Sequence, residues 1–358
     1  MIRVRPAALC DLEAIDAVCV RNGLSSFDTV ETRNWWLSHP FRTEFEGVPI
    51  GWVLESDTDG IVGTFSNVHM MYELDGRRFK CGSAGSWAVD RSHRNSSMLL
   101  AMSYFSQEGV DLCVNGSASA VASRLMPALG AQRTASEDYD LSYFWITRRR
   151  NFARAVLRKK KIPAAGLLSH AAALVLWAAD LRSGGRRRNL SEVKQLNGFG
   201  DEFDAFWEKI RQGRGRLRAV RSSAALEWRF GGYLRQKRAT VLAIFQGGHL
   251  GGYVVLRRCV REHLGLRQFV IADLQALDDS PDVILDLLAA ALEATRQEGL
   301  DALEWQGWNP AKRQVARSLH PKSYRYPVWP LYYKAVNPSL VPVLARADSW
   351  DFSPFDAF

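Results

Sequence analysis

Residues 89–109, VDRSHRNSSMLLAMSYFSQEG, join the end of an apolar strand to the start of an amphipathic helix. Apolar side chains recur at helical spacing from Met98 to Phe105, whereas the join before them is polar and basic. The join carries asparagine and serine where a phosphate-binding turn usually carries glycine. Because the amides at a helix start bind phosphate whatever their side chains, the join is either a variant phosphate site or a capped polar turn.

Three strands precede the join, and their spacing predicts an antiparallel meander. These strands are expected at 50–57, 61–74 and 77–90, connected by short turns that contain Asp-Gly pairs. A strand at 2–7 and a helix at 9–24 come before the meander. The elements expected after the long helix are a strand at 111–118, a short helix at 119–131 and a strand at 139–147.

A second run of the same elements begins near residue 217, without aligned residue identity. Its predicted strands are 240–245, 250–258, 267–277, 301–308 and 328–336, and its predicted helices are 280–299 and 309–320. The sequence therefore predicts an α/β (α+β) protein with two domains, each a mixed, mostly antiparallel sheet flanked by helices. The expected division is an N-terminal domain at 1–147, a basic helical linker at 148–216, a C-terminal domain at 217–338 and a tail at 339–358.

This order of elements, together with two local motifs, resembles the GNAT acyltransferase superfamily. WAV at 87–89 is similar to the apolar end of that family's fourth strand. Residues 94–99 follow its Arg/Gln-x-x-Gly-x-Gly/Ala turn, with Ser97 and Leu99 in place of glycines. The segment SAVASRLMPALGA at 119–131 is similar to the later signature Asn-x-x-Ala-x-x-Leu-Tyr-x-x-x-Gly-Phe. Two such domains in one chain also resemble the FemAB-type aminoacyl transferases and the tandem GNAT proteins of bacterial cell-surface polysaccharide loci.

The resemblance implies that acetyl-CoA or another acyl-CoA binds at the first join as a co-substrate, with its diphosphate on the helix amides. It implies no metal. The residues implied in CoA binding are Trp87, Ala88, Val89, Arg94, Asn95, Ser96, Ser97 and Asn115. The corresponding helix start in the second half carries Asp278, Asp279 and Asp282, which would repel a diphosphate. If one domain binds CoA, we therefore expect it to be the first.

Acyl transfer to an amine requires a base, an oxyanion donor and an acid for the thiolate. Met126 stands where many family members carry the tyrosine that acts as this acid. The predicted catalytic residues are Asp90, His69 and Tyr139, and the predicted substrate contacts are Glu44, Trp228, Arg229, Asp273 and Glu304. Glu44 is also a candidate base, and Tyr104 is an alternative acid. Several of these residues have a structural alternative: a core position for His69, a core or rim position for the two tyrosines, a tryptophan anchor with an ion pair for the Trp228-Arg229 pair, and helix capping or a salt bridge for the acids Asp273 and Glu304.

The composition is that of an ordinary globular protein, with 47% hydrophobic and 24% charged residues among 358. The formal net charge of +9 is concentrated, because residues 148–161 carry eight basic residues and no acidic one, and RSGGRRR at 182–188 adds four more. Such clusters favour an anionic partner or form a solvated linker face. The five cysteines form no CxxC pair and no metal-spaced group with histidine, which argues against a disulfide framework and a structural zinc.

The first 15 residues lack the apolar core of a signal peptide, and we expect a cytoplasmic protein. Residues 162–181 approach the length of a membrane span, but Ser169 and His170 interrupt them. We expect this stretch to pack on protein or to lie at a membrane interface. Residues 148–188 would then make peripheral contact with anionic lipid.

Three functions follow from these patterns. The first, which we expect, is an acyl-CoA-dependent N-acyltransferase whose acceptor is an amine, on a small molecule, a sugar-nucleotide or a cell-surface polymer precursor. The second is a transferase that uses aminoacyl-tRNA, with residues 148–161 on the tRNA phosphates; we expect no other nucleic acid. The third is a catalytically degenerate GNAT-fold binding module, which the missing glycines and tyrosine favour.

Overall fold

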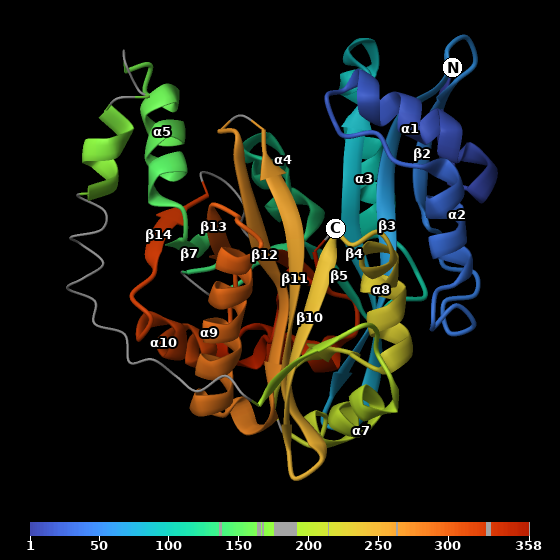
Figure 1. Ribbon diagram of the computed structural model, residues 1–358. Helices are drawn as coiled ribbons and strands as arrows, with labels where there is room; N and C mark the ends of the chain where they lie inside the picture. The colour runs from blue at the N-terminus through green and yellow to red at the C-terminus, as the bar shows by residue number, and fades with distance from the viewer. Residues whose placement is uncertain are drawn as a thin grey trace.

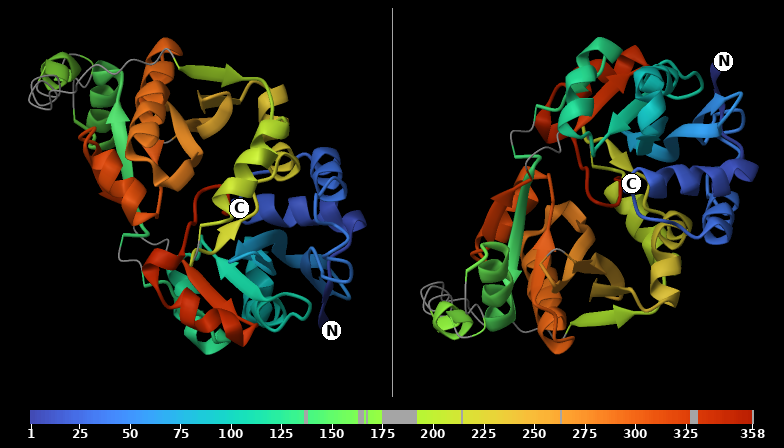
Figure 2. Two further views of the ribbon diagram at one scale, coloured as in Figure 1. Left: turned by 90° about the horizontal axis from the view of Figure 1, so that it is seen from below. Right: turned by 90° about the horizontal axis from the view of Figure 1, so that it is seen from above.

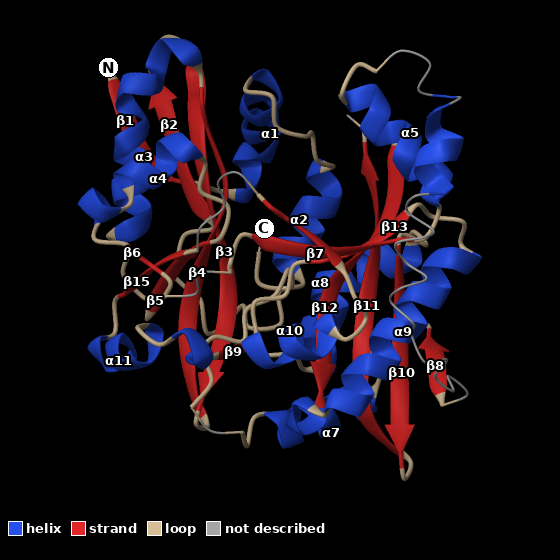
Figure 3. Cartoon of the chain, turned by 90° about the vertical axis from the view of Figure 1, so that its left-hand side faces the viewer, coloured by secondary structure: helices blue, strands red, loops and turns tan. Residues whose placement is uncertain are grey.

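The computed structural model describes residues 1–135, 138–162, 166, 168–174, 192–213, 215–262, 264–326 and 331–357. The basic run predicted at 182–188 lies outside these residues, as does the end of the stretch at 162–181. Within the described residues the chain forms two mixed sheets, which lie side by side in Figure 3. This confirms the predicted α/β class with two sheets flanked by helices.

The first sheet contains the predicted meander. In spatial order its strands are β1 (Ile2–Pro6), β2 (Gly51–Ser56), β3 (Gly60–Leu74), β4 (Arg77–Val89), β5 (Leu112–Asn115), β15 (Tyr332–Ala335) and β6 (Gln132–Arg133). The short strand β9 (Arg218–Ala219) pairs with the far end of β3. All neighbours are antiparallel except β4 and β5, which run parallel because α3 connects them.

The second sheet repeats this plan. Its strands are, in spatial order, β14 (Lys322–Arg325), β7 (Leu141–Ile146), β13 (Ala302–Trp305), β12 (Leu266–Ala276), β11 (His249–Arg261), β10 (Ala239–Gln246) and β8 (Val193–Leu196). Only β12 and β13 are parallel. Irregular register recurs at matching places, because both β2–β3 and β10–β11 carry a shift, and so do β3–β4 and β11–β12. Within the described residues the two sheets therefore share one strand order, whereas a tandem-domain protein stays a prediction.

Helices cover both sheets. The α-helices are α1 (Leu12–Arg21), α2 (Thr29–Leu37), α3 (Ser97–Phe105), α4 (Ala120–Leu125), α5 (Arg149–Lys159), α7 (Asp201–Ile210), α8 (Ser223–Arg235), α9 (Pro281–Gln297), α10 (Pro310–Arg317) and α11 (Val341–Leu344). The 3-10 turns are η1 (Leu9–Asp11), η2 (Arg91–Ser96), η3 (Pro127–Leu129), η4 (Leu277–Asp279), η5 (Pro338–Leu340) and η6 (Ala347–Ser349). Proline opens α9 at its first position, as the sequence predicts, and the helix buries its apolar face. The helix α5 lies at the outer end of the second sheet, away from the first half (Figure 1).

Each half contributes its last strand to the other half's sheet. β7, predicted as the final strand of the first domain, pairs with β13, whereas β15 pairs with β5 and β6 (Figure 3). β7 (LSYFWI) and β15 (YYKA) are both short, largely apolar strands that occupy the same place in the strand order of the two sheets, so local sequence does not select the partner. The predicted division at residue 147 therefore does not coincide with the sheets. Likewise β8 and α7, from the predicted linker at 148–216, are part of the second half.

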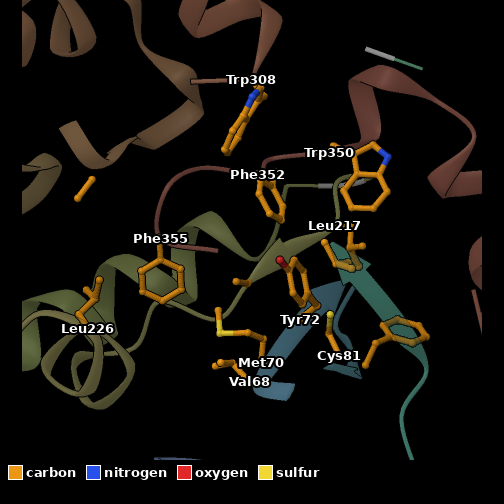
Figure 4. Close-up of a cluster of buried hydrophobic side chains, with 14 of the residues drawn as sticks. Val68, Met70, Tyr72, Cys81, Leu217, Leu226, Trp308, Trp350, Phe352 and Phe355 are labelled. Carbon is orange, nitrogen blue, oxygen red and sulfur yellow. The ribbon is translucent and has the colours of Figure 1, made fainter. Parts of the chain in front are cut away.

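The predicted tail at 339–358 is part of a core that both halves share. Trp350, Phe352 and Phe355 are each at most 4% exposed and belong to one apolar cluster with Tyr72 and Leu226 (Figure 4). The C-terminus accordingly lies between the two sheets (Figure 2). Aromatic side chains of this size bury large apolar areas, so the end of the chain holds the two halves together.

Candidate functional site

In the first half, the parallel strands β4 and β5 pair over a short stretch and then diverge; we call this divergence the first fork. The two strands pair only from Cys81–Leu112 to Ser83–Val114, whereas β4 continues to Val89. Residues 84–89 of β4, which we call its unpaired end, lack a partner on the β5 side but stay paired with β3 on the other side. This end is six residues long, about 20 Å at about 3.3 Å per residue. The other side of the fork ends at Asn115, which pairs with Tyr332 of β15. The fork opens toward the start of η2 and α3.

The hydroxyl of Tyr104 holds the base of this fork. It lies 2.7 Å from the carbonyl oxygen of Gly82 in β4 and 2.8 Å from that of Val114 in β5. Complete burial raises the pKa of Tyr104 well above its ordinary value. Because the ring is fully enclosed, this tyrosine fixes the divergence of the strands and is not accessible as the alternative acid.

The part of β4 that extends beyond its last pair with β5 carries a β-bulge. Register shifts where β4 passes Ser66, so that one more residue is accommodated in β4 than in β3 between Ala84 and Trp87. Ser86 is exposed and Gly85 and Trp87 are half-buried, which leaves this stretch of strand accessible. Backbone donors in such a bulge can face a developing oxyanion.

The start of the helix differs from the predicted turn, because residues 91–96 form the 3-10 helix η2. η2 runs directly into α3, and the amide of Ser97 donates to the carbonyl of Arg94. The amide of His93 donates to the carbonyl of Asp90 at 2.8 Å. Among the described residues no hydrogen bond involves the amides of Arg91 and Ser92. The polar residues 91–96 form an added helical turn in front of α3, and this turn accepts the amide hydrogen of Ser97. The free amide donors are therefore those of Arg91 and Ser92, at the start of η2.

The remaining residues of the predicted CoA site lie along this fork. Ala88 and Val89 are buried, Trp87 packs against Phe65, and Asn115 accepts a hydrogen bond from the amide of Ser117 at 3.2 Å. Arg94 and Asn95 are exposed, and Ser96 is half-buried. Leu99 is 44% exposed, so it turns outward and does not crowd the fork.

A pocket of about 450 Å³ lies beside η2, between α1 and the start of β3. Arg21, Asp59, Asp90, Ser92 and His93 contribute its polar lining. Asp90 accepts hydrogen bonds from Arg21 at 2.7 Å and from Asn22 at 2.9 Å, and the hydrogen bond from Arg21 lowers its pKa. A carboxylate held ionised in this way is a weak proton acceptor, and the structure places Asp90 in an ion pair with Arg21.

His69 lies inside the first half at 6% exposure. Its ring stacks on Phe45 at 4.5 Å, and its Nε2 lies 3.1 Å from the carbonyl oxygen of Pro49. Burial lowers its pKa to about 4. These contacts favour the core alternative for this histidine.

We expect acid to destabilise the fold through His69. The unfolded histidine binds a proton near pH 6.5, whereas the folded one stays neutral down to about pH 4. The unfolded state therefore binds more protons in this window, and the free energy of unfolding falls by up to about 3 kcal/mol as the pH drops through it. Urea titrations between pH 7 and pH 4 measure this fall. In His69→Gln, which does not titrate, the slope should be smaller by about one proton; an unchanged slope would refute the assignment.

Tyr139 lies beside the end of β5, on the side of the fork base that faces the second half. Its hydroxyl donates to the carbonyl of Gly116 at 3.2 Å, and its ring stacks on Trp308 at 4.5 Å. It is 2% exposed, and burial raises its pKa well above the ordinary value. A tyrosine so enclosed does not readily exchange a proton with substrate, which favours its structural alternative.

The five predicted substrate contacts do not converge on one site. Glu44 is exposed on the loop after α2, and Trp228 stacks on Trp35 at 4.4 Å. Arg229 donates to the carbonyl oxygens of Phe355 at 3.0 Å and Ala357 at 2.6 Å, so it anchors the chain end.

The two buried acids, Asp273 and Glu304, lie within hydrogen-bonded networks. Asp273 accepts from Arg221 and Tyr253, each at 2.8 Å. Glu304 accepts from Arg261 and Tyr324, each at 2.6 Å. Both carboxylates therefore match their ion-pair alternatives.

The equivalent fork of the second half is filled by its own side chains. β12 and β13 pair from Gln268–Ala302 to Ile271–Trp305, and β12 continues to Ala276. Lys312 of α10 donates to the carbonyl of Leu274 at 3.0 Å, to Gln275 at 2.9 Å and to Asp351 at 3.1 Å. Residues 271–276 are all buried, in contrast to the accessible Gly85–Trp87 stretch of β4.

Sequence reasoning missed Lys312, Arg221 and the buried end of the chain. One signal was present, because SWDFSPFDAF at 349–358 alternates large aromatic and acidic residues, unlike a solvated tail. The long-range partners of Lys312 and Arg221 leave no such local pattern.

The fold is that of the GCN5-related N-acetyltransferases. It is similar to a GCN5-related N-acetyltransferase from Anabaena variabilis, with a TM-score of 0.56 and 11% identity over 94% of this chain and 73% of that one. It is also similar to a probable N-acyltransferase from Enterococcus faecalis, with a TM-score of 0.57 and 11% identity over 94% and 73%. A third is the Saccharomyces cerevisiae N-myristoyltransferase with bound myristoyl-CoA, with a TM-score of 0.56 and 10% identity over 93% and 78%.

At these identities the likeness concerns the fold alone. Neither a protein-family model nor a curated protein matches the sequence. The resemblance to the FemAB-type transferases stays a prediction. In the described part of the chain, no group of three or more His, Cys, Asp or Glu side chains is placed to hold a metal ion. No described helix has the length and apolar content that crossing a membrane requires.

Proposed function

We propose that the protein is an acyl-CoA-dependent N-acyltransferase that binds its donor in the fork of the first half. The observation that carries this proposal is the contrast between the two forks. The first has an accessible bulge at Ser86 and free amides at Arg91 and Ser92. The second is closed by Lys312. The second half would then enclose the acyl thioester of the donor at the base of the first fork.

The residues of the first fork suit each part of such a donor. The free amides of η2 would bind the diphosphate, and the exposed guanidinium of Arg94 would add positive charge. The unpaired stretch of β4 offers backbone partners for the extended pantetheine arm. Acyl-CoA supplies an activated thioester, and the bulge between Ala84 and Trp87 would stabilise negative charge on the carbonyl oxygen during attack by the amine.

We propose an amine on a sugar-nucleotide or cell-surface polymer precursor as acceptor. The chain's net charge of +9 would favour the approach of such anionic molecules. The proposal also places the protein in the cytoplasm, where acyl-CoA is formed.

Calorimetry with CoA and acetyl-CoA tests the proposed function. We expect micromolar dissociation constants for both, because most of the binding surface contacts the shared carrier. Salt-sensitive binding of tRNA without binding of CoA would instead support the aminoacyl-tRNA alternative. Binding of none of these ligands would support the binding-module alternative and refute the donor site.

We also propose that the end of α5 contacts an anionic membrane surface. Arg158, Lys159 and Lys160 are exposed there, and Leu168 and Leu174 on the following helical residues are 46% and 64% exposed. Clustered positive charge beside exposed apolar side chains suits a lipid headgroup region.

Reversing the charges of Arg158, Lys159 and Lys160 to glutamate should abolish sedimentation with phosphatidylglycerol vesicles at low salt. Phosphatidylcholine vesicles should sediment neither protein. The control is a triple reversal at the exposed residues Arg42, Arg77 and Lys209, which changes the net charge equally. Equal losses in the two triple variants would show that only net charge matters and would refute a local contact.

A further inference from the structure

Residues 352–356, near the end of the chain, cover the base of the first fork on the side that faces the second half. The hydroxyl of Ser83, the last β4 residue paired with β5, donates to the carbonyl of Asp356 at 3.2 Å. Tyr72 of β3 donates to the carboxylate of Asp356 at 3.0 Å. Arg229 holds the same segment through its carbonyl oxygens. This part of the chain is therefore fixed against both the fork and the second half.

Three aromatic side chains form a packed wall at this point, which we call the aromatic wall: Tyr139, Trp308 and Phe352. The Tyr139 and Trp308 rings are parallel within 7° at 4.5 Å, and the Phe352 ring lies 4.8 Å from Trp308. All three are at most 5% exposed. Figure 4 shows Phe352 between Trp308 of the second half and Tyr72 of the first.

The aromatic wall closely abuts the end of β5. Gly116 follows Asn115, the last residue of that strand, and its carbonyl accepts the Tyr139 hydroxyl. A Cβ added at Gly116 would lie 3.0 Å from that hydroxyl and 3.5 Å from the Phe352 ring. There is therefore little space between the end of β5 and the aromatic wall.

We infer that the aromatic wall limits the donor to a short acyl group, and that Phe352 is a specificity-determining residue. This inference rests on the proposed function. With the diphosphate at the start of η2, the carrier extends along the unpaired end of β4, about 20 Å. Its thioester then lies near the fork base, with the acyl group directed at the wall. A chain of several carbons would need Phe352 to move out of a packed core, which is costly.

The experiment measures the binding of CoA, acetyl-CoA, butyryl-CoA and octanoyl-CoA to the full chain by calorimetry. For the unmodified protein we expect octanoyl-CoA to bind at least tenfold more weakly than acetyl-CoA. Phe352→Ala removes most of one side chain of the aromatic wall. It should reduce the ratio of the octanoyl-CoA to the acetyl-CoA dissociation constant at least tenfold. Phe352→Leu removes less volume, is expected to remain folded, and should reduce the ratio partly.

The matched control is Phe269→Leu, which makes the same change at a fully buried position in the core beside α9. It should lower stability without changing the ratio between acyl-CoA esters. Equal affinity for acetyl-CoA and octanoyl-CoA in the unmodified protein would overturn the inference and leave the proposed function intact. Equal changes of the ratio in Phe352→Leu and Phe269→Leu would also overturn it. Failure to bind CoA and all its esters would overturn both proposals.

Discussion

Replacing Arg221 by methionine should lower the free energy of unfolding by about 3–5 kcal/mol. Arg221 is 2% exposed, and its guanidinium contacts Asp273 at 2.8 Å and Asp356 at 3.3 Å. It also donates to the carbonyl of Ala219 at 2.8 Å. Methionine fills similar space without charge, so two buried carboxylates would lose their common cation. The same change would weaken the attachment of the chain end to both halves.

Urea unfolding at neutral pH measures this loss. The control is Arg235→Met, because Arg235 pairs with Glu227 on the surface and is 72% exposed in its side chain. Exposed ion pairs typically contribute about 0–1 kcal/mol. If Arg221→Met cost no more than the control, the buried network would not be what joins the two halves.

Replacing Arg91 by proline should weaken CoA binding by about tenfold to a hundredfold relative to Arg91→Ala. Both variants lose the guanidinium, but only proline lacks the amide that we assign to the diphosphate. A hydrogen bond to a charged group contributes about 1.5–3 kcal/mol, which corresponds to this range of affinity. The backbone should accept the change, because Arg91 is the first residue of η2 and Asp90 before it is extended, with φ −57° and ψ 143°.

Calorimetry with CoA compares the two variants, and their thermal unfolding verifies that both remain folded. Equal affinities would show that the Arg91 amide does not contact the diphosphate. A melting temperature that falls only in Arg91→Pro would instead reveal a backbone change. In that case hydrogen exchange of η2 in the absence of CoA would separate the two effects.

Local patterns predicted most elements of this fold. Strand-like runs joined by Asp-Gly turns located the meander, and Pro281 with its following apolar spacing located α9. The topological repeat was also visible in the order of elements. The partners of β7 and β15 were not, because either short, largely apolar strand fits the equivalent place in both sheets and long-range pairing decides between them.

The candidate site was predicted less well than the fold. The position of the fork beside Val89 followed from the motif at 87–99, but the helical extension of η2 did not, since Asn95 and Ser96 suit a cap, a loop and a 3-10 turn equally. His69 and Tyr139 illustrate a different limit. Sequence shows that a residue can transfer a proton, whereas its burial depends on side chains distant in the chain, such as Phe45 and Trp308.

The central claim is that the first fork, and not the second, binds the donor. Hydrogen–deuterium exchange of the unmodified protein with and without CoA tests it directly. We expect slower exchange of backbone amides in residues 84–97 and no change in residues 271–281. Slower exchange confined to 271–281, or no change in either segment at saturating CoA, would contradict the claim.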